Sequence, residues 1–227
     1  MLSHMKRTEP SRMGFVLVGG RSSRMGVDKA FVDLGGQTLL DRALNVLGTV
    51  CDQVAIVGDP AKFDPAKLHP VLFDSARAAP SASSKCAAVV ADIFPGCGPL
   101  AGIHAALLHS SADLNLILAV DMPFISRELL AFLLTAAEDP GVIVTVPRAG
   151  KGLQPLCAVY RREFSAVAEH ALQAGKYKID AAFAGTRIRV IEPGELADAG
   201  FSERSFFNVN TPQDRLAAEG GSSYTFA

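Results

Sequence analysis

Glycine and positive charge are concentrated in one short stretch near the start of the chain. An apolar run at 14–18 is followed directly by Gly19 and Gly20, and Arg24 and Lys29 come soon after. Glycine allows positive φ angles and a close approach of backbone to ligand, and successive backbone N–H groups can form a nest for an anion. These residues therefore predict a phosphate-binding loop, for which a nucleoside triphosphate is the natural ligand.

Two better-known phosphate-binding signatures do not fit this spacing. A P-loop requires lysine directly after the second glycine of GxxxxGK[ST], but Lys29 stands three positions after Gly26. The dinucleotide fingerprint GxGxxG is also absent from this stretch. The spacing therefore argues against a switch GTPase and against a hydride-transfer enzyme. A solvated turn with incidental charges is the alternative explanation for the glycines alone.

A carboxylate ends the most apolar run of the chain, which covers 114–121 and closes with Asp121. Mg²⁺ prefers oxygen ligands, and it commonly takes one or two carboxylates together with substrate phosphates. Taken alone, Asp121 would more simply be a turn residue before Pro123. Beside a phosphate-binding loop, it predicts a magnesium ligand.

Both groups can act together only if a sheet brings the ends of their strands to one edge. Strand-like apolar runs alternate with amphipathic segments through most of the chain, which predicts a three-layer, Rossmann-like α/β fold with a mostly parallel central sheet. Ligands bind such sheets at the carboxyl ends of the strands. We expect strands within 14–18, 53–59, 87–92, 114–121, 141–147, 155–160 and 186–192, and helices within 37–48, 99–110, 126–137 and 162–175.

The composition limits the domain organisation and the class of partner. The 227 residues are 49% hydrophobic, which suits a single domain over 14–219 with flexible tails at 1–13 and 220–227. Residues 74–86 are rich in Ala, Ser and Pro, and we expect a flexible insertion loop there. A formal net charge of −1 argues against nucleic-acid binding.

Other features of the composition are typical of a cytoplasmic protein. No apolar run approaches the ~20 residues that cross a bilayer, and the first residues lack the apolar core of a signal peptide, so we expect no membrane partner. The four cysteines form no CxxC pair. They are therefore expected to be small buried side chains in a reducing compartment.

Several motifs occur in the same order in a known family. The string GGRSSRMGVDKA (19–30) closely resembles the signature of nucleotidyltransferases of the MobA-like, molybdenum cofactor guanylyltransferase type. GPLAG at 98–102, the Asp-x-Pro of 121–123 and NVNTP at 208–212 match further motifs of that family. The resemblance covers Gly14 to Leu216 and implies the nucleotidyltransferase form of the three-layer fold.

The resemblance also implies roles along the nucleotide. The backbone around Leu17 to Gly19 would hold the nucleotide, Lys29 would contact its phosphates with Arg24 in support, and Asp121 would bind Mg²⁺. Val18 stands where the family usually has alanine. The nucleotide-binding residues expected on this basis are Leu17, Val18, Gly19, Gly20, Lys29, Asp92, Gly98 and Asp121, and the catalytic ones are Lys29, Asp121 and Arg24.

An aspartate shortly before GPLAG contacts the guanine base in this family. A carboxylate can accept hydrogen bonds from the guanine N1–H and amino group together. Asp92 has the more typical offset, and Asp74 is the weaker candidate because the insertion separates it from the motif. Capping of a helix is the alternative role for either residue.

The resemblance assigns amide side chains to a second, pterin-containing substrate. Asn208 and Asn210 resemble family residues linked to a pterin substrate, and Gln154 lies in a further matching segment. Amides offer both donors and acceptors to a pterin edge. Local structure explains only part of NVNTP, since Thr211 and Pro212 are suited to begin a helix.

The resemblance implies a magnesium-dependent transfer of GMP from GTP to molybdopterin, giving pyrophosphate and the guanine dinucleotide form of the molybdenum cofactor. Proteins that donate and receive the cofactor would be further partners. A related nucleotidyltransferase that uses CTP with molybdopterin, or acts on a sugar phosphate, is the alternative. A nucleotide-binding protein that catalyses no reaction is a third interpretation. The presence of both Lys29 and Asp121 argues against it.

Overall fold

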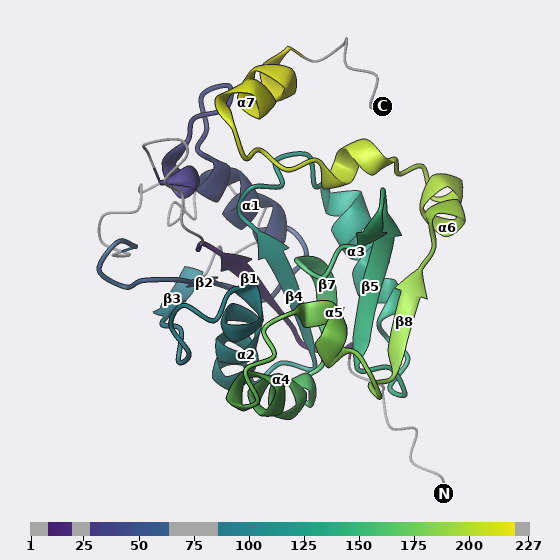
Figure 1. Ribbon diagram of the computed structural model, residues 1–227. Coiled ribbons are helices and arrows are strands. Elements are labelled where there is room, and N and C mark those ends of the chain that lie inside the picture. Colours follow the sequence, from purple (N-terminus) through teal and green to yellow (C-terminus); the bar gives the residue numbers. More distant parts are fainter. Residues whose placement is uncertain (1–8, 20–27, 64–85, 221–227) are drawn as a thin grey trace, which may run out of the picture.

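A mixed sheet forms the middle layer of the molecule (Figure 1). The structure is a computed structural model that describes residues 9–19, 28–63 and 86–220. Along the sheet the strands follow the order β3-β2-β1-β4-β7-β5-β6, with β8 beside β5. The strands are β1 (Arg12–Leu17), β2 (Gln53–Val57), β3 (Cys86–Val90), β4 (Leu114–Ala119), β5 (Val144–Ala149), β6 (Gly152–Leu153), β7 (Cys157–Tyr160) and β8 (Ile188–Ile191).

Helices cover both faces of the sheet, with α2, α4 and α5 in front and α1 and α3 behind in Figure 1. Phe15 and Leu17 of β1 belong to the front core, whereas Val16 and Val18 belong to the back core, because successive strand side chains point to opposite faces. The expected three-layer α/β fold is thus confirmed. The helices named so far are α1 (Leu39–Gly48), α2 (Pro99–His109), α3 (Arg127–Ala136), α4 (Phe164–Gln173) and α5 (Ile179–Ala182).

Parallel pairing places one set of strand ends at a common edge. β1 runs parallel to β2 and to β4, and β2 runs parallel to β3. The ladder continues past the strand ends, since Val18 N–H donates to Val57 O at 3.0 Å and Val120 N–H donates to Leu17 O at 3.2 Å. The carboxyl ends of β1, β2 and β4 are therefore held together.

The other half of the sheet is mixed. β7 lies between β4 and β5 and is antiparallel to both, while β8 is parallel to β5. The apolar run at 155–160 correctly predicts a strand, but a buried run reads the same in either direction. The parallel half, which carries the predicted loop and carboxylate, is the half that agrees with the expectation.

The chain after β8 returns across the carboxyl edge of the sheet (Figure 1). This segment contains α6 (Pro193–Asp198), a 3₁₀ turn at Glu203–Phe206 and α7 (Pro212–Glu219). Thr211 caps α7 as expected, because its side chain accepts from Asp214 N–H at 3.1 Å. The short elements before α7 are too brief to leave a periodic signal in the sequence.

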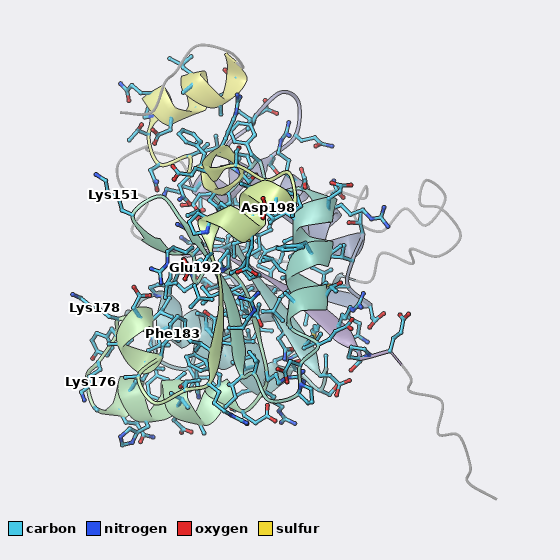
Figure 2. All side chains as sticks on the ribbon, turned by 90° about the vertical axis from the view of Figure 1, so that its right-hand side faces the viewer. Lys151, Lys176, Lys178, Phe183, Glu192 and Asp198 are labelled. Atoms are coloured by element: carbon cyan, nitrogen blue, oxygen red, sulfur yellow. The ribbon has the colours of Figure 1, made fainter. Side chains whose placement is uncertain are left out.

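The end of the sheet beside α6 and the β5–β6 turn faces solvent. Figure 2 shows Lys151 of that turn, with Lys176 and Lys178 of the α4–α5 connection, extending outward from one side, and all three are exposed. Phe183, by contrast, is buried against the ring of Phe164, with ring centroids 5.7 Å apart. No helix in the described part of the chain is long and apolar enough to cross a membrane.

Gly58 is required where the ends of β1 and β2 meet, and this gives a test of the fold. A Cβ at Gly58 would lie 2.5 Å from Val18 Cγ2 and 2.8 Å from Val18 O. We expect Gly58→Ala to lower the free energy of unfolding by about 1–3 kcal/mol, the usual cost of overpacking. Gly48→Ala in α1 is the matched control, since nothing lies within 4 Å of its added Cβ. Equal urea midpoints for the two variants would contradict this packing.

Candidate active site

A pocket of about 540 Å³ opens at the carboxyl edge of β1, β2 and β4. Its walls are the ends of these strands, the start of the 3₁₀ turn at Lys29–Phe31, and the segment that leads from Asp92 into α2. Most of the nucleotide-binding residues predicted from the sequence meet here. They are Leu17, Val18, Gly19, Lys29, Asp92, Gly98 and Asp121.

Lys29 is the point at which three distant segments of the chain meet. Its Nζ lies 3.4 Å from Asp121 Oδ2 and donates to Asn210 Oδ1 at 2.5 Å. Asp28 fixes the start of the turn that carries Lys29, because its Oδ1 accepts from Ala30 N–H at 3.2 Å. The side chains of Lys29 and Asp121 are only 22% and 20% exposed, so their charges interact with less screening than a surface pair.

Asp121 is held from both sides through its backbone. It follows β4, whose extension bonds to β1 through Val120 N–H, and its own carbonyl accepts from Val209 N–H at 2.8 Å. The C-terminal segment is therefore docked onto the residue that the sequence marks as a metal ligand. The docking also places Asn210 beside Lys29.

The donor set fits a metal that arrives with its nucleotide. No group of three His, Cys, Asp or Glu side chains with metal-binding geometry occurs among the described residues, so a metal site made of protein groups alone is not formed by them. Asp121 offers one carboxylate at the pocket wall. One carboxylate completed by substrate phosphates is a common arrangement for Mg²⁺.

The GPLAG motif forms part of the pocket wall and starts α2. Gly98 is the N-cap, with φ +79°. Residues other than glycine rarely adopt this backbone conformation. Pro99 occupies the first turn, as expected. Gly102 lets the helix approach β1, because a Cβ there would lie 3.2 Å from Leu17 Cδ2. The motif thus shapes the pocket through its backbone.

Asp92 lies at the pocket wall after β3 and is half-buried. Its Oδ1 accepts from Phe94 N–H at 2.9 Å. Burial raises the pKa of Asp92, while the Phe94 hydrogen bond and the electrostatic interaction with His104 act in the opposite direction. As the pH falls, Asp92 is therefore protonated at a higher pH than an ordinary aspartate. The carboxylate form is the one that could accept hydrogen bonds from a guanine base.

Other predicted residues bond within their own segments. Gln154 Nε2 donates to Ala149 O at 3.0 Å across the β5–β6 turn, and Asn208 Nδ2 donates to Phe206 O at 3.3 Å. Neither forms part of the pocket wall. Arg24, Gly20 and Asp74 lie outside the described residues.

Sequence reasoning missed some residues of the pocket. Asp28, Gly58 and Leu156 line it. Asp28 stands inside the string that carries the family signature, directly before Lys29, so its place could have been inferred. Gly58 and Leu156 left no such signal, because their position depends on how β1, β2 and β7 pack.

Cys51, Cys97 and Cys157 are free thiols and take no part in the pocket wall. Burial raises the pKa of both Cys51 and Cys157 to about 12, and the charge of Asp52 adds to the effect at Cys51. Both side chains therefore stay protonated at neutral pH. This agrees with the structural role expected for the cysteines and argues against thiolate catalysis at these two positions.

The chain is similar to a characterised class of proteins over most of its length. The family model described as MobA-like NTP transferase domain matches residues 14–187. A protein of Pelotomaculum thermopropionicum named "Probable molybdenum cofactor guanylyltransferase" is 36% identical over 205 residues, which are 90% of each chain. A "Molybdenum cofactor guanylyltransferase" of Desulfosudis oleivorans is 32% identical over 91% of this chain and 93% of its own.

A solved structure extends this similarity to the fold. The chain aligns with molybdopterin-guanine dinucleotide biosynthesis protein A from Archaeoglobus fulgidus with a TM-score of 0.73 and 29% identity. The alignment covers 92% of this chain and 97% of the other. The similarity therefore includes both the sheet and the segments that surround the pocket.

The contacts of Asn210 and Thr211 predict different effects of two neighbouring substitutions. Thr211→Ala removes the cap of α7 and should lower the free energy of unfolding by about 1 kcal/mol. Asn210 is exposed, so Asn210→Ala should change it by no more than about 0.5 kcal/mol. Urea unfolding of the two variants measures both values. A larger loss for Asn210→Ala than for Thr211→Ala would show that Asn210 is a structural residue.

Proposed function

The chain belongs to the MobA-like NTP transferase family and is a nucleotidyltransferase, and we propose that it transfers GMP from GTP to molybdopterin with release of pyrophosphate. The observation that carries this proposal is the placement of Lys29, Asp121 and Asp92 around one pocket of about 540 Å³. The wall offers an ammonium and a carboxylate in contact with each other, Lys29 and Asp121, and a second carboxylate, Asp92, that is suited to a guanine edge.

The pocket offers different groups to the phosphates and to the base. The backbone of Leu17 to Gly19 and the Lys29 ammonium suit the phosphates. Asp92, as a carboxylate, can accept from the guanine N1–H and amino group together. Adenine and cytosine do not present that pair of donors, so Asp92 would select the base.

The transfer requires little proton chemistry from the protein. A phosphate oxygen of molybdopterin attacks the α-phosphorus of GTP, and the bond from that phosphorus to the oxygen that bridges to the β-phosphate breaks. Pyrophosphate leaves, and the new phosphoanhydride joins the pterin to GMP. Since the attacking phosphate is already anionic, catalysis rests on positioning and charge neutralisation.

Lys29 and Asp121 are proposed to neutralise the phosphate charge in different ways. The Lys29 ammonium would turn from Asp121 toward the phosphates and act as a point charge there, with Arg24 as a second proposed cation. Asp121 would hold Mg²⁺, which neutralises phosphate oxygens when it is bound. In this scheme the contact between Lys29 and Asp121 keeps both groups oriented before the nucleotide arrives.

The acceptor side is assigned to the C-terminal segment. Asn210 contacts Lys29, which supports a place for the pterin phosphate near the same ammonium. Asn208 and Gln154 are proposed to complete the pterin contacts, and each would have to exchange its present hydrogen bond for one to the substrate. Donor and acceptor proteins of the cofactor and a cytoplasmic location belong to the same proposal.

A direct assay separates this function from its relatives. The protein is incubated with Mg²⁺, molybdopterin and either GTP, CTP or ATP, and the pterin dinucleotide and pyrophosphate are measured. Formation of the guanine dinucleotide in clear preference supports the proposal. Formation of the cytosine dinucleotide, or transfer only when a sugar phosphate replaces molybdopterin, would favour the alternative nucleotidyltransferases. Tight nucleotide binding without product would favour a non-catalytic protein.

Asp121→Asn tests the metal role. We expect the Mg²⁺ concentration for half-maximal rate to rise at least roughly tenfold, since even the loss of groups behind a metal ligand has that effect. The free energy of unfolding should change by about 1 kcal/mol or less, because only one part-exposed ion pair is lost. Asp198→Asn is the control, as Asp198 is exposed on α6, away from the pocket. An unchanged Mg²⁺ requirement in Asp121→Asn would make Asp121 a structural residue.

Asp92→Asn tests base selection. The ratio of kcat/KM for GTP to that for ATP should fall roughly ten- to hundredfold, because an amide cannot accept both guanine donors and loses a charge-assisted bond. The same ratio is measured for Asp74→Asn. A relaxed preference in Asp74→Asn together with an unchanged one in Asp92→Asn would assign the base contact to Asp74.

A further inference from the structure

A buried histidine stands behind the proposed base-selecting residue. His104 of α2 is only 1% exposed, and neither of its ring nitrogens has a hydrogen-bond partner among the described residues. Leaving a buried polar group unpaired costs about 1–3 kcal/mol. Leucine or phenylalanine would fill the same space without that cost, so the imidazole calls for an explanation other than packing.

The contacts of His104 lead to Asp92. Its ring meets the ring of Phe94 edge-on, with centroids 5.3 Å apart and planes at 66°. The backbone N–H of Phe94 donates to Asp92 Oδ1 at 2.9 Å. The carboxylate, the Phe94 turn and the imidazole therefore form one cluster, of which Asp92 lines the pocket.

The electrostatics of this cluster agree with its geometry. Burial raises the pKa of Asp92, whereas the Phe94 N–H and the electrostatic interaction with His104 favour its ionised form. The rest of the nearby wall supplies little compensation, since it consists largely of glycine backbone and of the apolar side chains of Leu17, Val57 and Pro99. A half-buried carboxylate in such surroundings depends on the few polar groups behind it.

We propose that His104 is a positioning residue for base selection, whose imidazole supports the Asp92 carboxylate from behind the Phe94 turn. The inference rests on the proposed function, because it assigns Asp92 to the guanine edge. His104 does not line the pocket, so it acts through Asp92 and makes no contact with the nucleotide itself. The residue is thus a determinant of specificity outside the binding wall.

The same helix provides a matched control. His109 also meets a phenylalanine edge-on, with its ring centroid 6.4 Å from that of Phe15. It is exposed at the other end of α2, away from Asp92. His104→Phe and His109→Phe are therefore the same substitution in similar ring contacts, and only the first removes an imidazole behind the carboxylate.

The test measures dissociation constants of GTP and ATP by calorimetry with Mg²⁺ present and no acceptor. We expect the preference for GTP over ATP to fall by about three- to tenfold in His104→Phe, the size of one net polar interaction, and to stay unchanged in His109→Phe. In an Asp92→Asn background, His104→Phe should have no further effect on the preference. A loosened fold would weaken both nucleotides alike, so the ratio separates positioning from structural damage.

The outcomes separate a failure of the proposed guanine specificity from a failure of the role assigned to His104. If the wild-type protein binds ATP as tightly as GTP, the proposed guanine specificity fails and this inference falls with it. If the wild type prefers GTP and Asp92→Asn abolishes that preference while His104→Phe keeps it, only the role of His104 is wrong. An effect of His104→Phe that persists at full size in the Asp92→Asn background would also overturn it.

Discussion

The ammonium group of Lys29 contacts parts of the chain that lie far apart in the sequence. It contacts Asp121 at the end of β4 and Asn210, which is 181 residues away in the sequence. Asn210 is held near both of these groups because the neighbouring backbone N–H of Val209 donates to Asp121 O. The residues proposed to bind the metal and the acceptor, Asp121 and Asn210, thus both contact the ammonium that is proposed to bind phosphate. The surrounding fold holds Lys29 between them.

The parallel half of the sheet supplies the rigidity that this arrangement needs. β1, β2 and β4 end together, and the hydrogen bonds from Val18 and Val120 extend the ladder to the pocket wall. Glycine then allows close packing, at Gly58 against Val18 and at Gly102 against the side chain of Leu17. The nucleotide is consequently expected to meet a wall of glycine backbone and apolar side chains, among which Lys29, Asp92 and Asp121 are charged. Such preorganised groups lose little energy to rearrangement during the reaction.

Much of this could be predicted from local patterns. Apolar runs and caps predict the strands and helices, and Asp121 and Lys29 stand out because they follow strands of a parallel sheet. The direction of β7 could not be predicted, because a buried run carries no mark of its partner. The return of the C-terminal segment was equally hidden, since it is built of short turns whose position depends on contacts such as that of Val209 with Asp121. The unpaired imidazole of His104 becomes informative only when burial is known.

In the proposed reaction, the Lys29 ammonium neutralises the phosphates between which GMP is transferred. Single-turnover formation of the guanine dinucleotide by Lys29→Ala and Lys62→Ala tests it most directly, because Lys62 is also paired with an aspartate near the pocket but is 60% exposed. We expect Lys29→Ala to slow the transfer step roughly a hundred- to thousandfold, while Lys62→Ala keeps the wild-type rate and both variants remain folded. Equal rates for the two variants, or a wild-type rate in Lys29→Ala, would contradict it.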